Sequence, residues 1–132
     1  MKTFKKSLLA LGLTLGIIAS VGGGAFAYEY TYGTVSGYGT TGHSYCYATS
    51  CWAYTKYNRS GYLSVNSVYN YVNTKTLSAG TKTKSSTKNN SSYATVDIYA
   101  PSNCRSVDMY STHVVSYGGQ TWTGNTNAKR YT

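Results

Sequence analysis

The residues with the most evident chemistry are three cysteines and two histidines. Cys46 and Cys51 are separated by four residues in the stretch H-S-Y-C-Y-A-T-S-C-W, and Cys104 lies far downstream. If residues 47–50 form a turn, the two thiols face each other across a hairpin, within the Cα separation of about 4.4–6.8 Å that a disulfide needs. This spacing predicts a Cys46–Cys51 disulfide. Bridges from Cys104 to either of these cysteines stay open, as do a free thiol or an intermolecular bond at the odd cysteine.

A zinc site is the alternative use of the same residues. His43, Cys46 and Cys51, joined by Cys104 or His113, would supply four ligands of suitable chemistry. The spacing H-x2-C-x4-C matches no compact zinc knuckle, however, and the fourth ligand would have to come from a distant element. We therefore predict no metal and no other cofactor.

Acidic residues are too few to mark a catalytic pair. Glu29, Asp97 and Asp108 are the three acids of the chain, so a pair of glycosidase type would have to be Asp97 with Asp108. Both alternate with apolar residues in a way that puts them on the solvated faces of strands. A cysteine–histidine couple is conceivable, but no local motif marks a nucleophile. We therefore predict that the protein is not an enzyme.

Basic residues gather in one polar segment, residues 73–91, which carries four lysines and no acid. Its T-K-T-K alternation predicts an exposed edge strand, where lysines protect against edge-to-edge aggregation. As a functional surface the same lysines would face anions, and exposed aromatic rings would add contacts of defined shape. The binding residues predicted in this way are Lys75, Lys82, Lys84, Lys88, Tyr93, Tyr99 and Trp122.

Strands must position these side chains, and the last third of the chain shows them most clearly. In S-Y-A-T-V-D-I-Y-A the small and apolar residues alternate with polar and tyrosine residues, which is typical of a strand with one buried face. Residues 106–117 repeat the pattern, and Gly118-Gly119 predicts a two-residue hairpin turn that leads into a third strand. The three are expected to form an antiparallel run.

The earlier part of the chain adds further strands with turns between them. Y-E-Y-T-Y from residue 28 predicts a first strand, and residues 33–42, with four glycines, predict a flexible loop. Residues 52–57 and 62–72 predict two more strands separated by the turn N-R-S-G. The tail, residues 124–132, shows no pattern and is expected to be loose.

Residues 1–27 have the pattern of a secretory signal peptide. Lysines come first, an apolar run follows, and the segment ends in A-F-A, a cleavage site with small residues. Cleavage after Ala27 would leave a single secreted, extracellular domain, residues 28–132, with no transmembrane anchor. That domain carries a net charge of +6 and all 16 tyrosines.

The fold class predicted for residues 28–132 is all-β, an antiparallel sandwich or small barrel of six to eight strands. Valine, isoleucine and leucine supply only 11 of these 105 residues. We therefore expect a core built largely from tyrosine rings, each with its hydroxyl group at water or at a partner. A disordered chain rich in serine, threonine and tyrosine is the alternative.

The segment K-T-K-S-S-T…S-S-Y-A-T-V and the hairpin after it resemble the lactococcin family, small basic β-sandwich bacteriocins that Gram-positive bacteria export. The likeness covers about residues 75–123, together with the signal ending A-F-A. The chain departs from the family in its length, its three cysteines and its first fifty residues. The resemblance implies a secreted antibacterial protein that acts at the envelope of other bacteria through the cell-wall precursor lipid II.

Two functions are therefore expected from the sequence. One is a bacteriocin-like protein whose lysines bind the polyanions of the envelope or the wall precursor. The other is a non-catalytic module that binds carbohydrate or cell wall through exposed tyrosine and tryptophan rings. Contact with a membrane surface is compatible with both functions, and no nucleic-acid partner is expected.

Overall fold

The protein is an all-β structure made of one antiparallel sheet. A computed structural model describes residues 27–130, so residues 1–26 of the predicted signal lie outside the described part of the chain. The described residues contain no helix, and hence none long and apolar enough to cross a membrane. The six strands are β1 (Tyr28–Val35), β2 (Tyr38–Cys46), β3 (Ser50–Asn73), β4 (Ala79–Tyr99), β5 (Cys104–Tyr117) and β6 (Gln120–Lys129).

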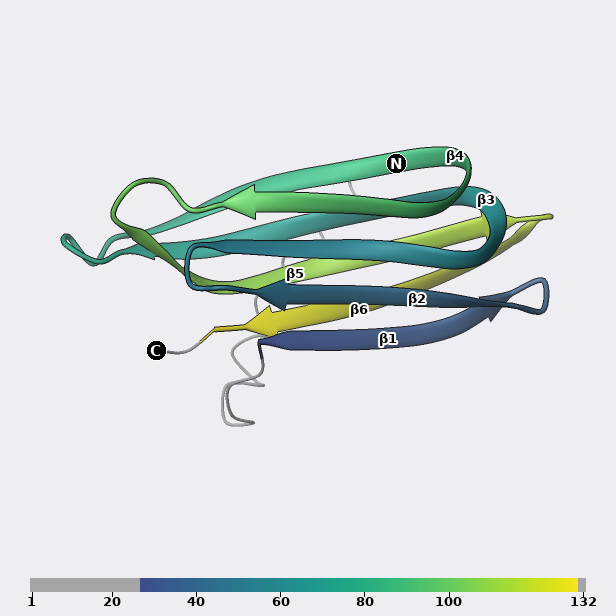
Figure 1. Cartoon of the computed structure of the whole chain (residues 1–132), viewed down its shortest axis with the longest axis horizontal. Coiled ribbons are helices and arrows are strands. Elements are labelled where there is room, and N and C mark those ends of the chain that lie inside the picture. Colours follow the sequence, from purple (N-terminus) through teal and green to yellow (C-terminus); the bar gives the residue numbers. More distant parts are fainter. Residues whose placement is uncertain (1–26, 131–132) are drawn as a thin grey trace.

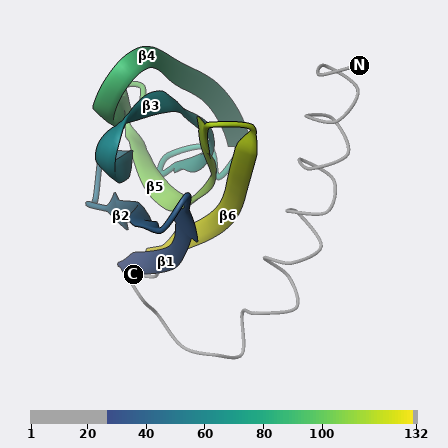
Figure 2. The same cartoon turned by 90° about the vertical axis from the view of Figure 1, so that its right-hand side faces the viewer.

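The sheet is folded over because β3 and β4 are long strands that bend back on themselves (Figure 1). Residues 50–56 of β3 pair with β2 on one side and with residues 93–99 of β4 on the other. Residues 62–73 of β3 pair with β5, and much of the same half pairs with residues 79–91 of β4. The result is a flattened barrel seen end-on in Figure 2. We call the half with β1 and β2 the first layer and the half with β5 and β6 the second layer.

The bend of β3 falls where the sequence predicts a turn, at residues 58–61. The β3–β4 register shifts between Lys56 and Gly61 and again between Gly61 and Leu63. Such bulges add a residue to one strand and let it change direction without leaving the sheet. Opposite this bend, Asn90 of β4 has φ of 49°, a left-handed conformation that asparagine tolerates. The two bends therefore form one corner of the barrel.

The barrel is closed on one side by β1 and β6. The amide of Asn127 donates to Glu29 Oε1 at 2.5 Å, and the amide of Ser36 donates to Gln120 Oε1 at 2.7 Å. Trp122 of β6 lies directly over Gly33, which leaves no room for a Cβ atom there. Side chains thus replace the main-chain ladder that a fully closed barrel would have.

On the opposite side the two halves of β4 face each other and two lysines bridge them. Lys82 Nζ donates to Tyr99 O and Lys84 Nζ donates to Asp97 O, both at 2.8 Å. These bonds satisfy carbonyl groups of an edge that has no partner strand. The basic segment 73–91 contains this first half of β4, and Lys82 and Lys84 have a structural use there.

The core is built mainly from small and aliphatic side chains, and the prediction of a core made largely of tyrosine rings is wrong. Tyr57 and Tyr69 are fully buried, and their hydroxyl groups bond to Val35 O and Ser106 Oγ at 3.0 and 2.8 Å. Eight other tyrosines within residues 27–130 are exposed. The interior of the flattened barrel is filled instead by Val35, Cys46, Cys51, Ala53, Leu63, Val65, Ala94, Val96, Ile98, Met109, Val115 and Ala128.

A buried histidine stands in the middle of this core. His113 Nδ1 lies 2.8 Å from Thr55 Oγ1, and Nε2 lies 2.8 Å from Thr126 Oγ1. Thr55 donates its hydroxyl proton to Ser64 O, so Nδ1 carries the ring proton and Nε2 accepts from Thr126. Burial lowers the pKa of His113 to about 3. The opposing strand makes space for the ring with a glycine, Gly42.

Several local predictions can be compared with this structure. The alternation over residues 93–99 and the Gly118-Gly119 turn, with φ of 59° and 81°, are confirmed. The flexible loop at residues 33–42 is wrong, because these residues complete β1 and begin β2 around a tight Ser36-Gly37 turn. The loose tail predicted for 124–132 is also wrong over residues 124–129, since β6 continues to Lys129 with Thr126 and Ala128 buried, whereas residues 131–132 lie outside the described part of the chain. The expected run of three neighbouring strands fails because β3 lies between β4 and β5.

The disulfide is the first testable feature. Cys46 and Cys51 are cross-strand partners at the end of the β2–β3 hairpin and are joined as predicted, while Cys104 is a buried free thiol. A non-reduced digest should contain a peptide pair linked through Cys46 and Cys51, with Cys104 alkylated only after denaturation. Replacing both linked cysteines by serine should lower the free energy of unfolding by about 2 kcal/mol, since the loop is short. Alkylation of all three cysteines without reductant would contradict the structure.

The second prediction concerns acid stability. The unfolded chain protonates His113 near its ordinary pKa of 6.5, whereas the folded chain resists protonation down to about 3. The free energy of unfolding therefore has its full value above pH 6.5. It falls as the pH drops toward 3, by up to about 1.4 kcal/mol per pH unit. Burial lowers the pKa of His43 as well, so protonation of the unfolded chain at this residue adds to the loss of stability at acid pH. The raised pKa of Asp108 has the opposite effect, because the folded chain binds a proton there more readily than the unfolded chain does.

Urea unfolding between pH 7 and pH 4 measures this loss, and His113→Gln should show a flatter dependence with the other two groups unchanged. Nuclear magnetic resonance of the wild-type imidazole provides a check that does not depend on the variant folding. Titration of His113 in the folded protein near pH 6.5 would contradict the buried, neutral ring.

Candidate functional site

The most unusual surface of the protein is the outer face of the first layer, which is covered by aromatic rings. Side chains from four neighbouring strands and from the β2–β3 connection meet there, and many of their rings are in contact. We call this surface the aromatic platform. Its members are Tyr28, Tyr30, Tyr32, His43, Tyr45, Tyr47, Trp52, Tyr54 and Tyr93.

The period of two in each strand and the register between strands produce this surface. In β1 the sequence Y-E-Y-T-Y puts three tyrosines on one face. Register then aligns rings across the sheet in rows that run at right angles to the strands. One row is Tyr28, Tyr45 and Trp52, continued by Asp97 on β4. The next row is Tyr30, His43 and Tyr54, continued by Thr95.

The rings form a continuous apolar surface in which each strand contributes one ring to a row. Ring centroids along the first row are 6.2 Å apart for Tyr28 and Tyr45 and 5.8 Å apart for Tyr45 and Trp52. Trp52 and Tyr54, neighbours on β3, are 5.9 Å apart and nearly parallel, at 12°. Contacts of this kind stabilise the rings against one another beyond their burial alone.

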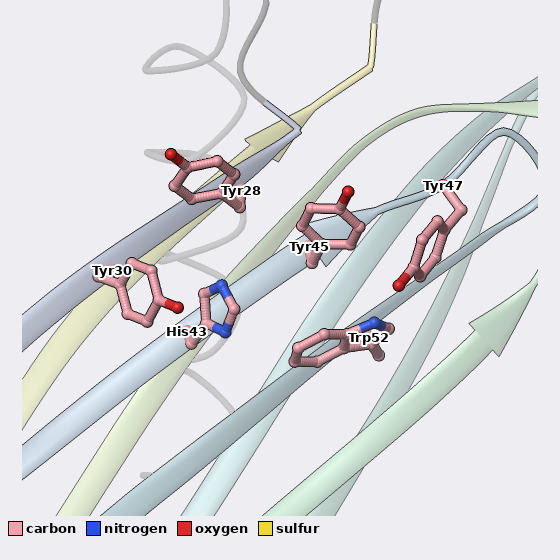
Figure 3. Close-up of a pocket in the computed structure, with 6 residues that line it drawn as sticks. All are labelled: Tyr28, Tyr30, His43, Tyr45, Tyr47 and Trp52. Atoms are coloured by element: carbon pink, nitrogen blue, oxygen red, sulfur yellow. The ribbon is translucent and has the colours of Figure 1, made fainter.

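A shallow, open depression of about 220 Å³ lies in this surface (Figure 3). It follows the first row and is bordered by Tyr47 from the β2–β3 connection. Tyr28, Tyr30 and Tyr47 keep 52%, 43% and 48% of their surface exposed, so their rings are accessible to a ligand. The lining residues are Tyr28, Tyr30, His43, Tyr45, Tyr47 and Trp52.

His43 forms the floor of the depression. Its imidazole stacks on Tyr30 with centroids 3.8 Å apart and meets Trp52 and Tyr54 edge to face at 5.0 and 5.2 Å. The side chain is 6% exposed, and neither ring nitrogen has a hydrogen-bond partner. Burial lowers the pKa of His43, so the ring is neutral at pH 7. The floor of the depression is therefore uncharged.

The predicted lysines lie apart from the platform. Lys75 is exposed in the turn between β3 and β4, and Lys88 is exposed near the bend of β4. Lys82 and Lys84 line an open pocket of about 320 Å³ between the halves of β4, where they donate to main-chain carbonyls. The four do not form one free anion-binding strip.

The predicted aromatic residues are also separated by the structure. Tyr93 belongs to the platform, where its ring lies 5.2 Å from Tyr54. Tyr99 is 64% exposed at the end of β4, beside the pocket that Lys82 lines. Trp122 is half-buried between β1 and β6 and packs on the core, so it is not the exposed ring that was predicted.

Sequence reasoning missed most of the platform. Alternation in Y-E-Y-T-Y does place three rings on one face, but the general expectation of a tyrosine core favours the interior for such rings. The sequence does contain a signal for the correct face. The residues of β2 and β3 that alternate with His43, Tyr45 and Trp52 are small, and small residues fit a narrow interior. Aromatic residues on the other parity must then face outward.

Most residues of the catalytic and zinc alternatives have structural roles. Cys46 and Cys51 are consumed by the disulfide, and residues 27–130 contain no group of three or more side chains able to hold a metal ion. Asp97 is exposed, whereas Asp108 is buried and accepts a bond from Asn70 Nδ2 at 2.7 Å. The expectation of a solvated Asp108 is therefore wrong. Burial raises the pKa of Asp108, and the bond from Asn70 and the charge of Lys129 oppose that rise.

Comparison with known proteins gives no further assignment: no protein-family model and no curated protein matches this chain.

Proposed function

We propose that this protein is a non-catalytic carbohydrate-binding module that uses the aromatic platform. The observation that carries the proposal is a set of contacting rings exposed on one face of a sheet, with a shallow depression over their first row. Contiguous exposed apolar surface on a small protein marks a site of interaction. An open depression suits a ligand that lies along a surface better than one enclosed in a cavity.

Sugars have the chemistry that such a platform accepts. One face of a pyranose ring presents C–H groups, which pack on the face of an aromatic ring, while its hydroxyl groups reach outward to water and polar neighbours. Tyrosine and tryptophan suit this use because each combines a large apolar ring with one polar group. Neutral His43 keeps charge away from the floor of the depression.

Bacterial cell-wall glycans are the target that fits the other features of the chain. The predicted secretory signal would deliver the protein outside the cell, and the disulfide is stable in an oxidising compartment. A rigid platform on a small barrel needs little reorganisation on binding. In this proposal the protein is secreted, extracellular and attached to the envelope through its sugars.

Antibacterial action remains a separate proposal, which follows from the resemblance to lactococcins. The platform would serve equally to attach a bacteriocin to its target cell. A growth assay with purified residues 28–132 separates the two, because a binding module adheres to bacteria without inhibiting them. Inhibition of Gram-positive strains by this protein would favour the bacteriocin.

The main prediction is that single ring deletions in the platform weaken binding strongly. Trp52→Ala and Tyr30→Ala should each reduce affinity for insoluble cell-wall glycan about tenfold or more, equivalent to about 1.4 kcal/mol of lost contact. Tyr62→Ala is the matched control, since Tyr62 is an exposed tyrosine that makes no platform contact. Pull-down with isolated cell walls, with circular dichroism to confirm folding, measures both. Equal loss in all three variants, or no loss in the platform variants, would contradict the proposal.

A second measurement tests the role of the lysines as an aid to encounter. Lys75 and Lys88 are exposed, so their charges attract envelope polyanions over about 10 Å at 0.1 M salt and over about 3 Å at 1 M. Lys75→Gln with Lys88→Gln should therefore weaken wall binding at low salt and leave it unchanged at high salt. Adding Lys82→Gln and Lys84→Gln removes two bridging bonds and should also lower stability. Wall binding by the double variant that equals the wild type at low salt would show that these charges only aid solubility.

A further inference from the structure

The three acidic side chains of the chain have very different surroundings. Glu29 Oε1 accepts the amide of Asn127, and Asp108 accepts the side chain of Asn70 inside the protein. Asp97 is exposed, and among residues 27–130 its carboxylate makes no hydrogen bond and no ion pair. Lys84 binds the main-chain oxygen of this residue, not its carboxylate. Two of three acids are thus engaged in the fold and one is free.

The position of Asp97 connects it to the platform. Residue 97 is the cross-strand partner of Trp52, and both flanking residues of β4, Val96 and Ile98, are buried. The Asp97 side chain therefore lies on the outer face, where directly opposed residues have Cβ atoms about 4.5–5.5 Å apart. It continues the row of Tyr28, Tyr45 and Trp52 by one strand. The aromatic row consequently ends in a carboxylate.

We propose that Asp97 is a specificity-determining residue of the platform and selects neutral glycans. This inference rests on the proposed function and deepens it. A sugar stacked on Trp52 presents its equatorial hydroxyl groups at the edge of the ring, toward β4. The two oxygens of a carboxylate accept hydrogen bonds from two adjacent hydroxyl groups, and bonds to a charged acceptor are stronger than neutral ones.

The same carboxylate disfavours acidic sugars at this position. A uronic acid or another carboxylated residue on Trp52 would bring a second negative charge beside Asp97, and like charges at short range repel. Lys82 and Lys84, which bind main-chain oxygens of β4 beside Asp97, weaken this repulsion but are held at the edge of β4 that does not pair with β3. The ligand that fits is a neutral polysaccharide lying across the strands, with adjacent free hydroxyl groups on the unit above Trp52. The aromatic rings bind any sugar, whereas Asp97 discriminates between neutral and acidic sugars.

The test compares two variants of Asp97 on soluble oligosaccharides by isothermal titration calorimetry. The probes are a neutral hexasaccharide with free adjacent hydroxyl groups and a hexasaccharide of uronic acid. Asp97→Ala should reduce affinity for the neutral probe roughly tenfold or more. Asp97→Asn, which keeps the size of the side chain and removes its charge, should narrow the preference for the neutral probe over the acidic one by a similar factor.

The matched control is Tyr62→Ala, since Tyr62 is exposed on the second half of β3, lies outside the depression and makes no platform contact. It should bind both probes as the wild type does. Neutral-probe affinity of Asp97→Ala equal to wild type, with Trp52→Ala inactive, would overturn the role of Asp97 and leave the proposed function intact. Failure of the wild type to bind either probe or cell-wall glycan would overturn both.

A third probe separates hydroxyl recognition from ion pairing. An oligosaccharide of glucosamine with free amino groups carries positive charge and would form a salt-sensitive pair with Asp97. Under the present proposal its affinity does not exceed that of the neutral probe. A preference for the amino sugar that disappears in Asp97→Asn and at high salt would replace the neutral ligand by a cationic one.

Discussion

The pairing of β3 with β4 is the interaction on which the rest of the structure depends. These two strands pair in both halves of the barrel and bend together, so their ladder is interrupted only by the bulges at residues 57–62 and resumes beyond them. β2 adds to one half of β3 and β5 adds to the other. Each layer is therefore built on one half of the β3–β4 pair. The side chains that fit inside the bend set the distance between the layers.

A narrow interior explains both the core and the surface. Alanine, serine, threonine, cysteine and valine fill most inward positions, and the histidine in the centre is held by two threonines. Large rings do not fit between layers this close, apart from Tyr57 and Tyr69 near the ends. The strands are nevertheless rich in tyrosine, which favours extended backbone. The rings are consequently displaced to the outside, where they supply contact area that the small core lacks.

The sequence was sufficient for the fold class, the disulfide and the hairpin at Gly118-Gly119, because each depends on local spacing. It was insufficient for the side of the sheet on which the tyrosines lie. Alternation gives two faces, but only the long-range register shows which face is inside, and that register depends on the bends of β3 and β4. Trp122 shows the same limit, since its half-burial results from Gly33 on a strand nearly ninety residues earlier. Asp97 entered the candidate site only when β4 was paired with β3.

The disulfide lies at one end of the aromatic platform. Cys46 follows Tyr45 and Cys51 precedes Trp52, so the covalent link joins the two strands at the point where these rings pack together. Tyr47, which borders the depression, stands in the short loop that the same bond closes. The disulfide therefore links the two strand segments and the short loop that carry these three rings. A newly made chain in a reducing compartment would lack this bond, so the proposed sugar-binding surface would acquire its covalent link only in an oxidising medium.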